Sequence, residues 1–205
     1  MDRELADLVN AELVTHGVKV LTGTKVTSIK RHGNQLRVTG DPGLEQIADM
    51  VVVVVGVQPD GHFAELAGAR LGARGSIVVD DHMRTGIPDV FAAGDCVHTH
   101  HRLLTEPAYL PLGTTAHKQG RVAGENAVGG DRKFAGSVGT QVVKVFDLAI
   151  ARTGLRDHEA VDAGYTPLTV DSKANDHKAY YPGAPRSRCE SPVTATPDSC
   201  WECSS

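Results

Sequence analysis

The sequence has few aromatic residues and no apolar stretch long enough to cross a bilayer. Aromatic residues make up only 4% of the 205 residues, which is thin for a β-sandwich core. The longest apolar run is Met50–Val55, whereas a membrane-spanning helix needs about 20 residues. Residues 1–20 mix charged and apolar side chains, so we expect no signal peptide. These features make a soluble, cytoplasmic protein without a membrane partner the default expectation.

A surplus of positive charge and a disulfide framework are also missing. The formal net charge is −4, so we expect no nucleic-acid partner and no anionic-membrane partner. Of the four cysteines, Cys96 lies alone in the middle of the chain, whereas Cys189, Cys200 and Cys203 gather near its end. This distribution does not resemble the cysteine spacing of a secreted, disulfide-stabilised domain.

A glycine motif is the most informative absence. The 22 glycines suit an α/β protein with many tight turns, but no Gly-x-Gly-x-x-Gly follows a predicted strand anywhere. Glycines in that pattern let backbone N–H groups and a helix N-terminus hold a pyrophosphate. The chain therefore lacks the usual cradle for the pyrophosphate of a dinucleotide.

Hydrophobic periodicity up to residue 60 predicts a helix followed by strands. Leu5, Leu8 and Leu13 recur at helical spacing, and Gly17 is a natural C-cap. The turn signal His32-Gly33-Asn34 predicts a hairpin, and the β-branched run Met50–Val55 suits a strand buried on both faces. The expected elements are a helix at 2–16 and strands at 18–21, 25–30, 35–38 and 50–55.

Beyond residue 60 the pattern predicts helices that alternate with strands. Small residues along one of these helices, at 116, 120, 123 and 127, would let it pack closely on a sheet. From Pro185 onward neither a period of 2 nor one of 3.6 is present, so we expect a disordered or non-family tail. The expected elements are helices at 63–69, 114–127 and 157–163, strands at 76–80, 90–93 and 140–146, a helical turn at 147–154 and an extended segment at 161–170.

The stretch Thr85–Cys96 carries the clearest functional signal. It predicts a turn, a short strand at 90–93 covered on both faces, and then Gly94 and Asp95 at the carboxyl end of that strand. Gly94 has no side chain, so backbone or a ligand can approach it closely. Asp95 places a carboxylate where ligands bind in open α/β sheets, and a carboxylate accepts hydrogen bonds from hydroxyl groups such as those of a flavin's ribityl chain.

These residues resemble the second flavin-binding motif of the FAD-dependent pyridine nucleotide-disulfide oxidoreductases. Three further segments narrow the resemblance to the branch of coenzyme A-disulfide reductases, NADH oxidases and persulfide reductases. They are His101–Leu104 with Pro107–Arg121, Gly139–Leu148, and Ala179–Gly183. The resemblance covers about residues 2–184, and it implies that the chain corresponds to a C-terminal fragment of a longer flavoenzyme.

The resemblance implies an α/β fold class, a partial flavoprotein with two dinucleotide-binding domains followed by the start of an α+β dimerisation domain. Residues 1–60 would be the C-terminal half of an NAD(P)H-binding domain and residues 61–130 a returning FAD-binding segment. Residues 136–184 would be part of the dimerisation domain, and 185–205 the tail. Both glycine motifs and the redox cysteine of the branch lie in parts of the family that this chain does not match.

The resemblance also assigns candidate cofactor-binding residues. Gly94 and Asp95 would face the ribityl chain of FAD, although Asp95 could instead cap the following turn. Pro111, Leu112, Gly113 and Thr114 would face the pyrimidine end of the flavin, where unpaired N–H groups open a helix. An ordinary N-cap by Thr114 or Thr115 is the plain alternative.

Other candidates are weaker. Gly56 and Val57 follow the run Met50–Val55 and would either approach a nicotinamide cofactor or form a plain turn. Tyr180 and Tyr181 resemble dimer-interface tyrosines of the branch, with strand packing as the alternative.

Metal-ligating and redox patterns are explained better without metal or thiol chemistry. Cys96, His98, His100 and His101 share one loop, but their spacing lacks a second ligand pair for zinc, so we expect no metal site. Cys96 has no resolving partner nearby, and Cys200-Trp201-Glu202-Cys203 ends a patternless tail. We therefore assign no catalytic residue.

The function that the resemblance implies is an FAD-dependent oxidoreductase with FAD and NAD(P)H as cofactors. NAD(P)H would reduce the flavin, and the flavin would reduce a small molecule, namely a disulfide, a persulfide or oxygen. The intact family implies a homodimer. The alternative is a non-catalytic fragment or a partner-dependent half of a split flavoprotein.

Overall fold

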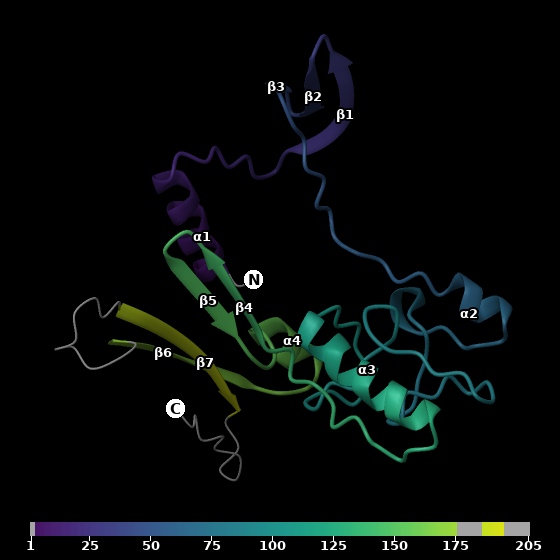
Figure 1. Cartoon of the computed structure of the whole chain (residues 1–205). Coiled ribbons are helices and arrows are strands. Elements are labelled where there is room, and N and C mark those ends of the chain that lie inside the picture. The colour runs from purple at the N-terminus through teal and green to yellow at the C-terminus, as the bar shows by residue number, and fades with distance from the viewer. Residues whose placement is uncertain (1–2, 176–185, 195–205) are drawn as a thin grey trace. The chain divides into compact units, whose positions relative to one another are not determined.

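The chain forms two units, which are described separately. The computed structural model describes residues 3–175 and 186–194 (Figure 1). One unit comprises Gln58–Val142 and the chain from Ala151 onward, and the other comprises Arg3–Val57 with Val143–Ile150. The division lies close to the boundary expected at residue 60, but the assignment of domains to cofactors and to dimerisation stays a prediction. Within the described residues, no helix is both long enough and apolar enough to span a membrane.

The unit that begins at Arg3 opens with the helix that the sequence predicts. The helix α1 spans Arg3–Thr15, and Gly17 follows it with a φ of +78°, the left-handed backbone that a C-cap glycine supplies. The N–H of Val18 reaches back to the carbonyl of Leu13 at 2.9 Å. These bonds satisfy carbonyl groups that the helix end would otherwise leave unpaired.

The same unit contains a three-stranded antiparallel sheet in the order β1-β2-β3 (Figure 1). Its strands are β1 (Lys25–His32), β2 (Gln35–Asp41) and β3 (Leu44–Ala48). Gly33 makes the tight turn between β1 and β2 with a φ of +63°, which confirms the hairpin. The strand β3 is not predicted from the sequence, since its short segment has no clear alternation of apolar and polar residues.

Two strands expected in this unit are absent, so those predictions were wrong. Residues 18–21 and Met50–Val55 adopt no strand, and Val55 is 90% exposed. No backbone hydrogen bond joins 50–55 to any described residue. A strand buried on both faces needs neighbouring strands and covering layers on each side, and the described part of the chain places none there.

The other unit is built around the helix α3, Gly113–Ala127, which confirms the helix predicted at 114–127. Loops and short elements surround it (Figure 1). The remaining elements are α2 (His62–Leu66), a 3-10 turn at Ala73–Gly75, α4 (Asp157–Asp162) and an antiparallel pair of β6 (Pro167–Asn175) and β7 (Arg186–Thr194). The strands β4 (Gln141–Val145) and β5 (Leu148–Arg152) pair as a hairpin that runs across the division between the units.

Several local predictions for this unit were wrong. Residues 76–80 and 90–93 make only isolated bridges, in which Ile77 pairs with Leu71 and Val97, because no long neighbouring strand lies beside them. The helical turn expected at 147–154 is instead the strand β5, and its partner β4 is the strand that the sequence predicts at 140–146. Residues 186–194, expected to lack regular structure, form β7, and the remainder of that tail lies outside the described residues.

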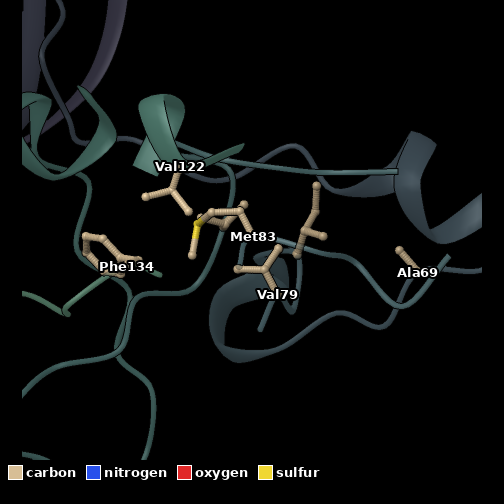
Figure 2. Packing of buried hydrophobic residues seen from close by; sticks show 7 residues of the cluster. Ala69, Val79, Met83, Val122 and Phe134 are labelled. Atoms are coloured by element: carbon tan, nitrogen blue, oxygen red, sulfur yellow. The ribbon is translucent and has the colours of Figure 1, made fainter. Parts of the chain in front are cut away.

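The core of this unit packs beneath α3. Figure 2 shows Val122 and Phe134 directed towards Met83, with Val79 beside it and Ala69 farther along the cluster. Met83 is only 2% exposed and Val97 only 1% exposed. The full cluster is Ala69, Ile77, Val79, Met83, Val97, Val122 and Phe134.

The buried face of α3 is mostly polar, which corrects the prediction of a small-residue face. Its buried residues are Thr115, Gln119, Val122 and Asn126, whereas Gly120 and Ala127 are exposed. Polar groups that are buried require hydrogen-bond partners, and Asn126 has them. Its amide nitrogen donates to the carbonyls of His82 at 2.9 Å and Arg132 at 2.8 Å, and its oxygen accepts the N–H of Arg132 at 2.7 Å. Asn126 thus joins the end of α3 to two loops.

Truncating Met83 tests whether this cluster is the core. Met83→Ala should lower the free energy of unfolding by about 2–5 kcal/mol, because it removes a buried side chain and leaves a cavity. Met50→Ala is the matched control, since Met50 is 76% exposed, and we expect a change within about 0.5 kcal/mol. Urea denaturation of both variants measures the difference, and equal losses would show that Met83 is not part of a packed core.

Candidate functional site

Gly94 and Asp95 lie in a tight turn rather than at the end of a regular strand. Gly94 adopts a φ of +92°, a left-handed backbone that favours glycine, and its carbonyl accepts the N–H of Val97 at 3.2 Å. The Asp95 side chain is exposed, and among the described residues no hydrogen bond to its carboxylate is present. Asp95 therefore does not cap the following turn, and its carboxylate is available to accept hydrogen bonds from a ligand.

Gln119 on α3 holds this turn in place. Its side-chain oxygen accepts the N–H of Gly94 at 3.1 Å, and its nitrogen donates to the hydroxyl of Thr99 at 3.2 Å. Gln119 and Thr99 are each 1% exposed, so the bond between them is buried, whereas the bond to Gly94 is partly buried. A Cβ added at Gly94 would lie 3.7 Å from the Cβ of Ala116. The Gly94 turn therefore packs directly against the first turns of α3.

The N-terminus of α3 presents unpaired backbone donors. Leu112 is the N-cap, with extended backbone and no capping side chain. The first hydrogen bond of the helix is made by Ala116, whose N–H donates to the carbonyl of Leu112 at 2.8 Å. Within the described residues, the N–H groups of Gly113, Thr114 and Thr115 have no acceptor. The alternative of an ordinary N-cap by Thr114 or Thr115 is wrong, since the N-cap is Leu112 and the Thr115 hydroxyl pairs with the Ser137 hydroxyl at 3.2 Å.

Tyr109 lies close to the same turn. Burial raises the pKa of its phenol above the usual 10.0, and the negative charge of Asp95 raises it further. Arg74 acts in the opposite direction, with its guanidinium carbon 5.9 Å from the ring centroid, within the usual range of a cation–π contact. Tyr109 therefore stays a neutral phenol at pH 7, and it adds no negative charge beside Asp95.

The structure brings some of the predicted site residues together and leaves others apart. The Gly94 turn packs against Ala116 and Gln119 of α3, the helix that Pro111 and Leu112 lead into. Gly56 and Val57 lie in the other unit. Gly56 has a φ of +101°, and both residues are exposed. Tyr180 and Tyr181 lie outside the described residues, as does the Cys200–Cys203 pair.

The cysteine and histidines of the loop after Gly94 are used as structural hydrogen-bonding groups. The Cys96 thiol donates to the carbonyl of Ala93 at 3.4 Å, and His98 Nε2 lies 2.8 Å from the carbonyl of Val79. His101 accepts the N–H of Leu103 through Nδ1 at 3.2 Å. Among the described residues, the groups whose ligand atoms lie near one another are elsewhere, at Glu12, His16 and Asp147 and at Asp80–His82.

Sequence analysis missed Gln119, the residue that joins the two parts of the candidate site. The available signal was its position on the helix, four residues after Thr115 and three before Val122. A polar residue in register with a buried apolar one implies a buried partner. The small residues at 116, 120, 123 and 127 indicated a different face of the helix as the buried one.

Comparison with known proteins identifies the family. Residues 1–120 match the model of the pyridine nucleotide-disulphide oxidoreductases. The chain belongs to this family. The match contains Gly94, Asp95 and the segment Pro111–Thr114, so the family that the sequence resembles is confirmed.

Individual relatives agree with the branch expected from the sequence. The chain is 36% identical over 182 residues to the NAD(P)H sulfur oxidoreductase (CoA-dependent) of Pyrococcus furiosus, a match that covers 89% of this chain and 41% of the relative. The solved NAD-dependent persulfide reductase from A. fulgidus is 39% identical with a TM-score of 0.88, over 95% of this chain and 36% of that one. An FAD-dependent family member from Desulfovibrio vulgaris is 37% identical with a TM-score of 0.75, over 84% and 43% of the two chains.

The chain thus spans about 40% of the length of the curated relatives it matches. The high TM-score supports the partial α/β flavoprotein fold. The activities, substrates and partners named for these longer relatives are properties of the relatives themselves.

Removing Gln119 tests its role as the tie between α3 and the Gly94 turn. Gln119→Ala should lower the free energy of unfolding by about 1–3 kcal/mol, because it leaves the Gly94 N–H and the Thr99 hydroxyl without their partners. Gln46→Ala, at an exposed position on β3, is the matched control and should change stability by less than about 0.5 kcal/mol. Amide hydrogen exchange at Gly94 should accelerate in the first variant alone, and unchanged exchange there would contradict the assignment.

The burial of His101 predicts a dependence of stability on pH. Burial lowers the pKa of folded His101 below its usual 6.5, although Glu159 partly opposes this. As the pH falls, the unfolded chain therefore takes up this proton first. The contribution of neutral His101 is complete above about pH 6.5 and is lost as the pH falls towards the lowered pKa of the folded state.

Urea denaturation at about pH 8 and about pH 5 measures this loss. The chain has 10 histidines, so the relevant quantity is the difference between the wild type and His101→Asn, which does not titrate in this range. The variant should lose less stability on acidification than the wild type. Equal losses would show that His101 is not held neutral by the fold.

Proposed function

We propose that the chain supplies the returning flavin-binding segment of an FAD-dependent NAD(P)H oxidoreductase. The observation that carries the proposal is the contact between the Gly94 turn and the N-terminal turns of α3, held by Gln119. This contact combines an unpartnered carboxylate with unpartnered backbone donors. The family match and the names of the relatives support the same function.

The residues at this contact fit a flavin. The Asp95 carboxylate is exposed and can accept hydrogen bonds from ribityl hydroxyls. The N–H groups of Gly113–Thr115 are donors at the positive end of a helix dipole, and they suit the end of a flavin that becomes negative on reduction. Gly94 contributes no side chain, so its backbone can approach a ligand closely. Bound FAD would supply the transfer of electrons, and these residues would position it and stabilise its charge.

The proposal also covers NAD(P)H as reductant and a disulfide, a persulfide or oxygen as acceptor. These come from the resemblance and from the family name, and the described residues do not choose among the acceptors. Gly56 and Val57 are kept as the candidate positions for the nicotinamide cofactor. A homodimer and a cytoplasmic location are parts of the same proposal, and sedimentation of the purified chain tests the first of them.

The missing glycine motif limits what the chain does alone. Binding of the pyrophosphate needs backbone donors from that motif, so we expect the chain by itself to bind FAD weakly or not at all. A complete FAD-binding site would therefore need a polypeptide that carries the glycine motif.

The absorbance of flavin in the purified protein tests the proposal. The chain alone should carry no stoichiometric FAD. Mixed with the part of the Pyrococcus furiosus relative that it does not span, it should retain FAD, and Asp95→Ala should weaken this retention by about tenfold or more, as expected for a hydrogen bond to a charged group. Asp7→Ala, at an exposed position on α1, is the matched control. Stoichiometric FAD in the chain alone, or equal effects of the two substitutions, would contradict the proposal.

A second candidate function is that of a partner-dependent half without activity of its own. The run Met50–Val55 favours it, because these residues are largely exposed and their backbone groups are unpaired within the described chain. A β-branched run in this state is typical of a strand that needs neighbours in a parallel sheet. If this candidate is correct, mixing with the complementary part should protect the amides of 50–55 from hydrogen exchange without producing NAD(P)H oxidation.

A further inference from the structure

A small pocket lies between the first turns of α3 and the segment that follows this helix. Its lining includes Arg102 from the preceding loop, Thr114, Thr115 and Lys118 from α3, and Ser137 and Thr140 from the segment before β4. All of these residues belong to one unit. Gly94 and Asp95 do not line it, whereas Thr114 belongs both to this pocket and to the segment that we assign to the flavin.

The lining is cationic. Arg102 and Lys118 carry its two charges, and no carboxylate lines the pocket. Among the described residues, neither side chain takes part in an ion pair. Cations that share a pocket without an acidic partner repel each other, and an anion placed between them removes that repulsion.

Hydroxyl groups and backbone donors complete the polar surface. Among the described residues the Thr114 hydroxyl has no partner and can donate to an anion. The hydroxyls of Thr115 and Ser137 pair with each other at 3.2 Å and that of Thr140 pairs with Thr153 at 2.7 Å, so each pair has one proton left to donate. The unpaired N–H groups at the start of α3 belong to two of these residues, Thr114 and Thr115. Together with Arg102 and Lys118, they form a set dominated by donors, which is the composition that phosphate oxygens require.

Hydrogen bonds fix the walls of the pocket. The N–H of Arg102 donates to the carbonyl of Ser137 at 2.9 Å, and the N–H of Ser137 donates to the carbonyl of His100 at 3.0 Å. The Ser137 hydroxyl accepts the N–H of Gly139 at 3.1 Å and contacts the Thr115 hydroxyl at 3.2 Å. These bonds hold α3 and the following segment at a set separation, so the polar groups are positioned before a ligand arrives.

Gly136 lies where the backbone that lines the pocket comes close to the side chains of Arg102 and His100. A Cβ at this position would lie 2.9 Å from the Cγ of Arg102 and 2.8 Å from the Cδ2 of His100. Its φ of +84° also disfavours a side chain. The glycine therefore lets the stem of Arg102 pass close to the backbone.

The size of the pocket selects the ligand. Its volume is about 140 Å³, several times the roughly 30 Å³ that a water molecule occupies in the liquid and below the roughly 300 Å³ of the smallest pockets for drug-sized ligands. A tetrahedral anion with a few water molecules fits this space.

We propose that this pocket binds a phosphate group, either as free phosphate or as the terminal phosphate of a small ester. Arg102 contributes a planar fork of donors and Lys118 a point charge, and the hydroxyl of Thr114 adds a neutral hydrogen bond. The site does not depend on the binding of FAD, so it can be tested in the flavin-free chain.

Titration calorimetry of the full chain with inorganic phosphate and with glycerol 3-phosphate tests the proposal. Saturable binding of phosphate alone identifies a site for the free anion, and binding of the ester as well identifies a site for phosphate esters. Arg102→Gln and Lys118→Gln should each weaken binding about tenfold or more, since each removes charge-assisted hydrogen bonds. Arg70→Gln and Lys30→Gln, at exposed positions outside the pocket, are the matched controls and should leave the affinity unchanged.

Three results would overturn the proposal. They are the absence of binding by either probe, an equal loss of affinity in the pocket variants and the controls, and complete displacement of phosphate by an excess of FAD. The last result would make the pocket part of the flavin-binding surface. Thermal denaturation of each variant without phosphate confirms that it is folded, and added phosphate should raise the midpoint of the wild type more than that of either pocket variant.

Discussion

The pair of hydrogen bonds made by Gln119 is the constraint on which the candidate site depends. One side chain in the second turn of α3 binds the backbone of Gly94 and the hydroxyl of Thr99, and it is almost fully buried. Its two bonds set the distance between a turn that carries a carboxylate and a helix end that carries unpaired donors. Because the Gln119 side chain is buried, losing either bond leaves a polar group without a partner.

Residues of α3 contribute to three different features of the structure. Beside the Gly94 turn, its first N–H groups and Asp95 fit the polar features of a flavin. Towards the segment before β4, Thr115 and Lys118 line a pocket whose walls are tied by Ser137. At its far end, Asn126 fixes the loops that surround the Met83 core. A helix with a polar buried face thus positions loops through hydrogen bonds, where a purely apolar face would only pack against them.

The features that could be predicted from the sequence are those encoded locally. Periodicity identified α1 and α3, and His32-Gly33-Asn34 identified the hairpin, because these elements close their hydrogen bonds within a few residues. The run Met50–Val55 was mistaken for a buried strand, since its state depends on neighbours far away in the chain. Gln119 was missed for a related reason, because its partners Gly94 and Thr99 are distant in sequence. The resemblance assigns Gly94, Asp95 and Pro111–Thr114 to FAD, which stays a prediction, and the structure packs the Gly94 turn against Ala116 and Gln119 of the helix that follows Pro111.

Amide spectra of the full chain, mixed with the part of the Pyrococcus furiosus relative that it does not span, test most directly during addition of FAD whether Gln119 assembles a flavin-facing surface. We expect shifts at Gly94, Asp95, Gly113 and Thr114, with the amides of β1–β3 unchanged. In Gln119→Ala these shifts should weaken together, since the turn and the helix end would no longer be held at a fixed distance. Shifts confined to other parts of the chain, or shifts that are the same in the wild type and Gln119→Ala, would contradict this assignment.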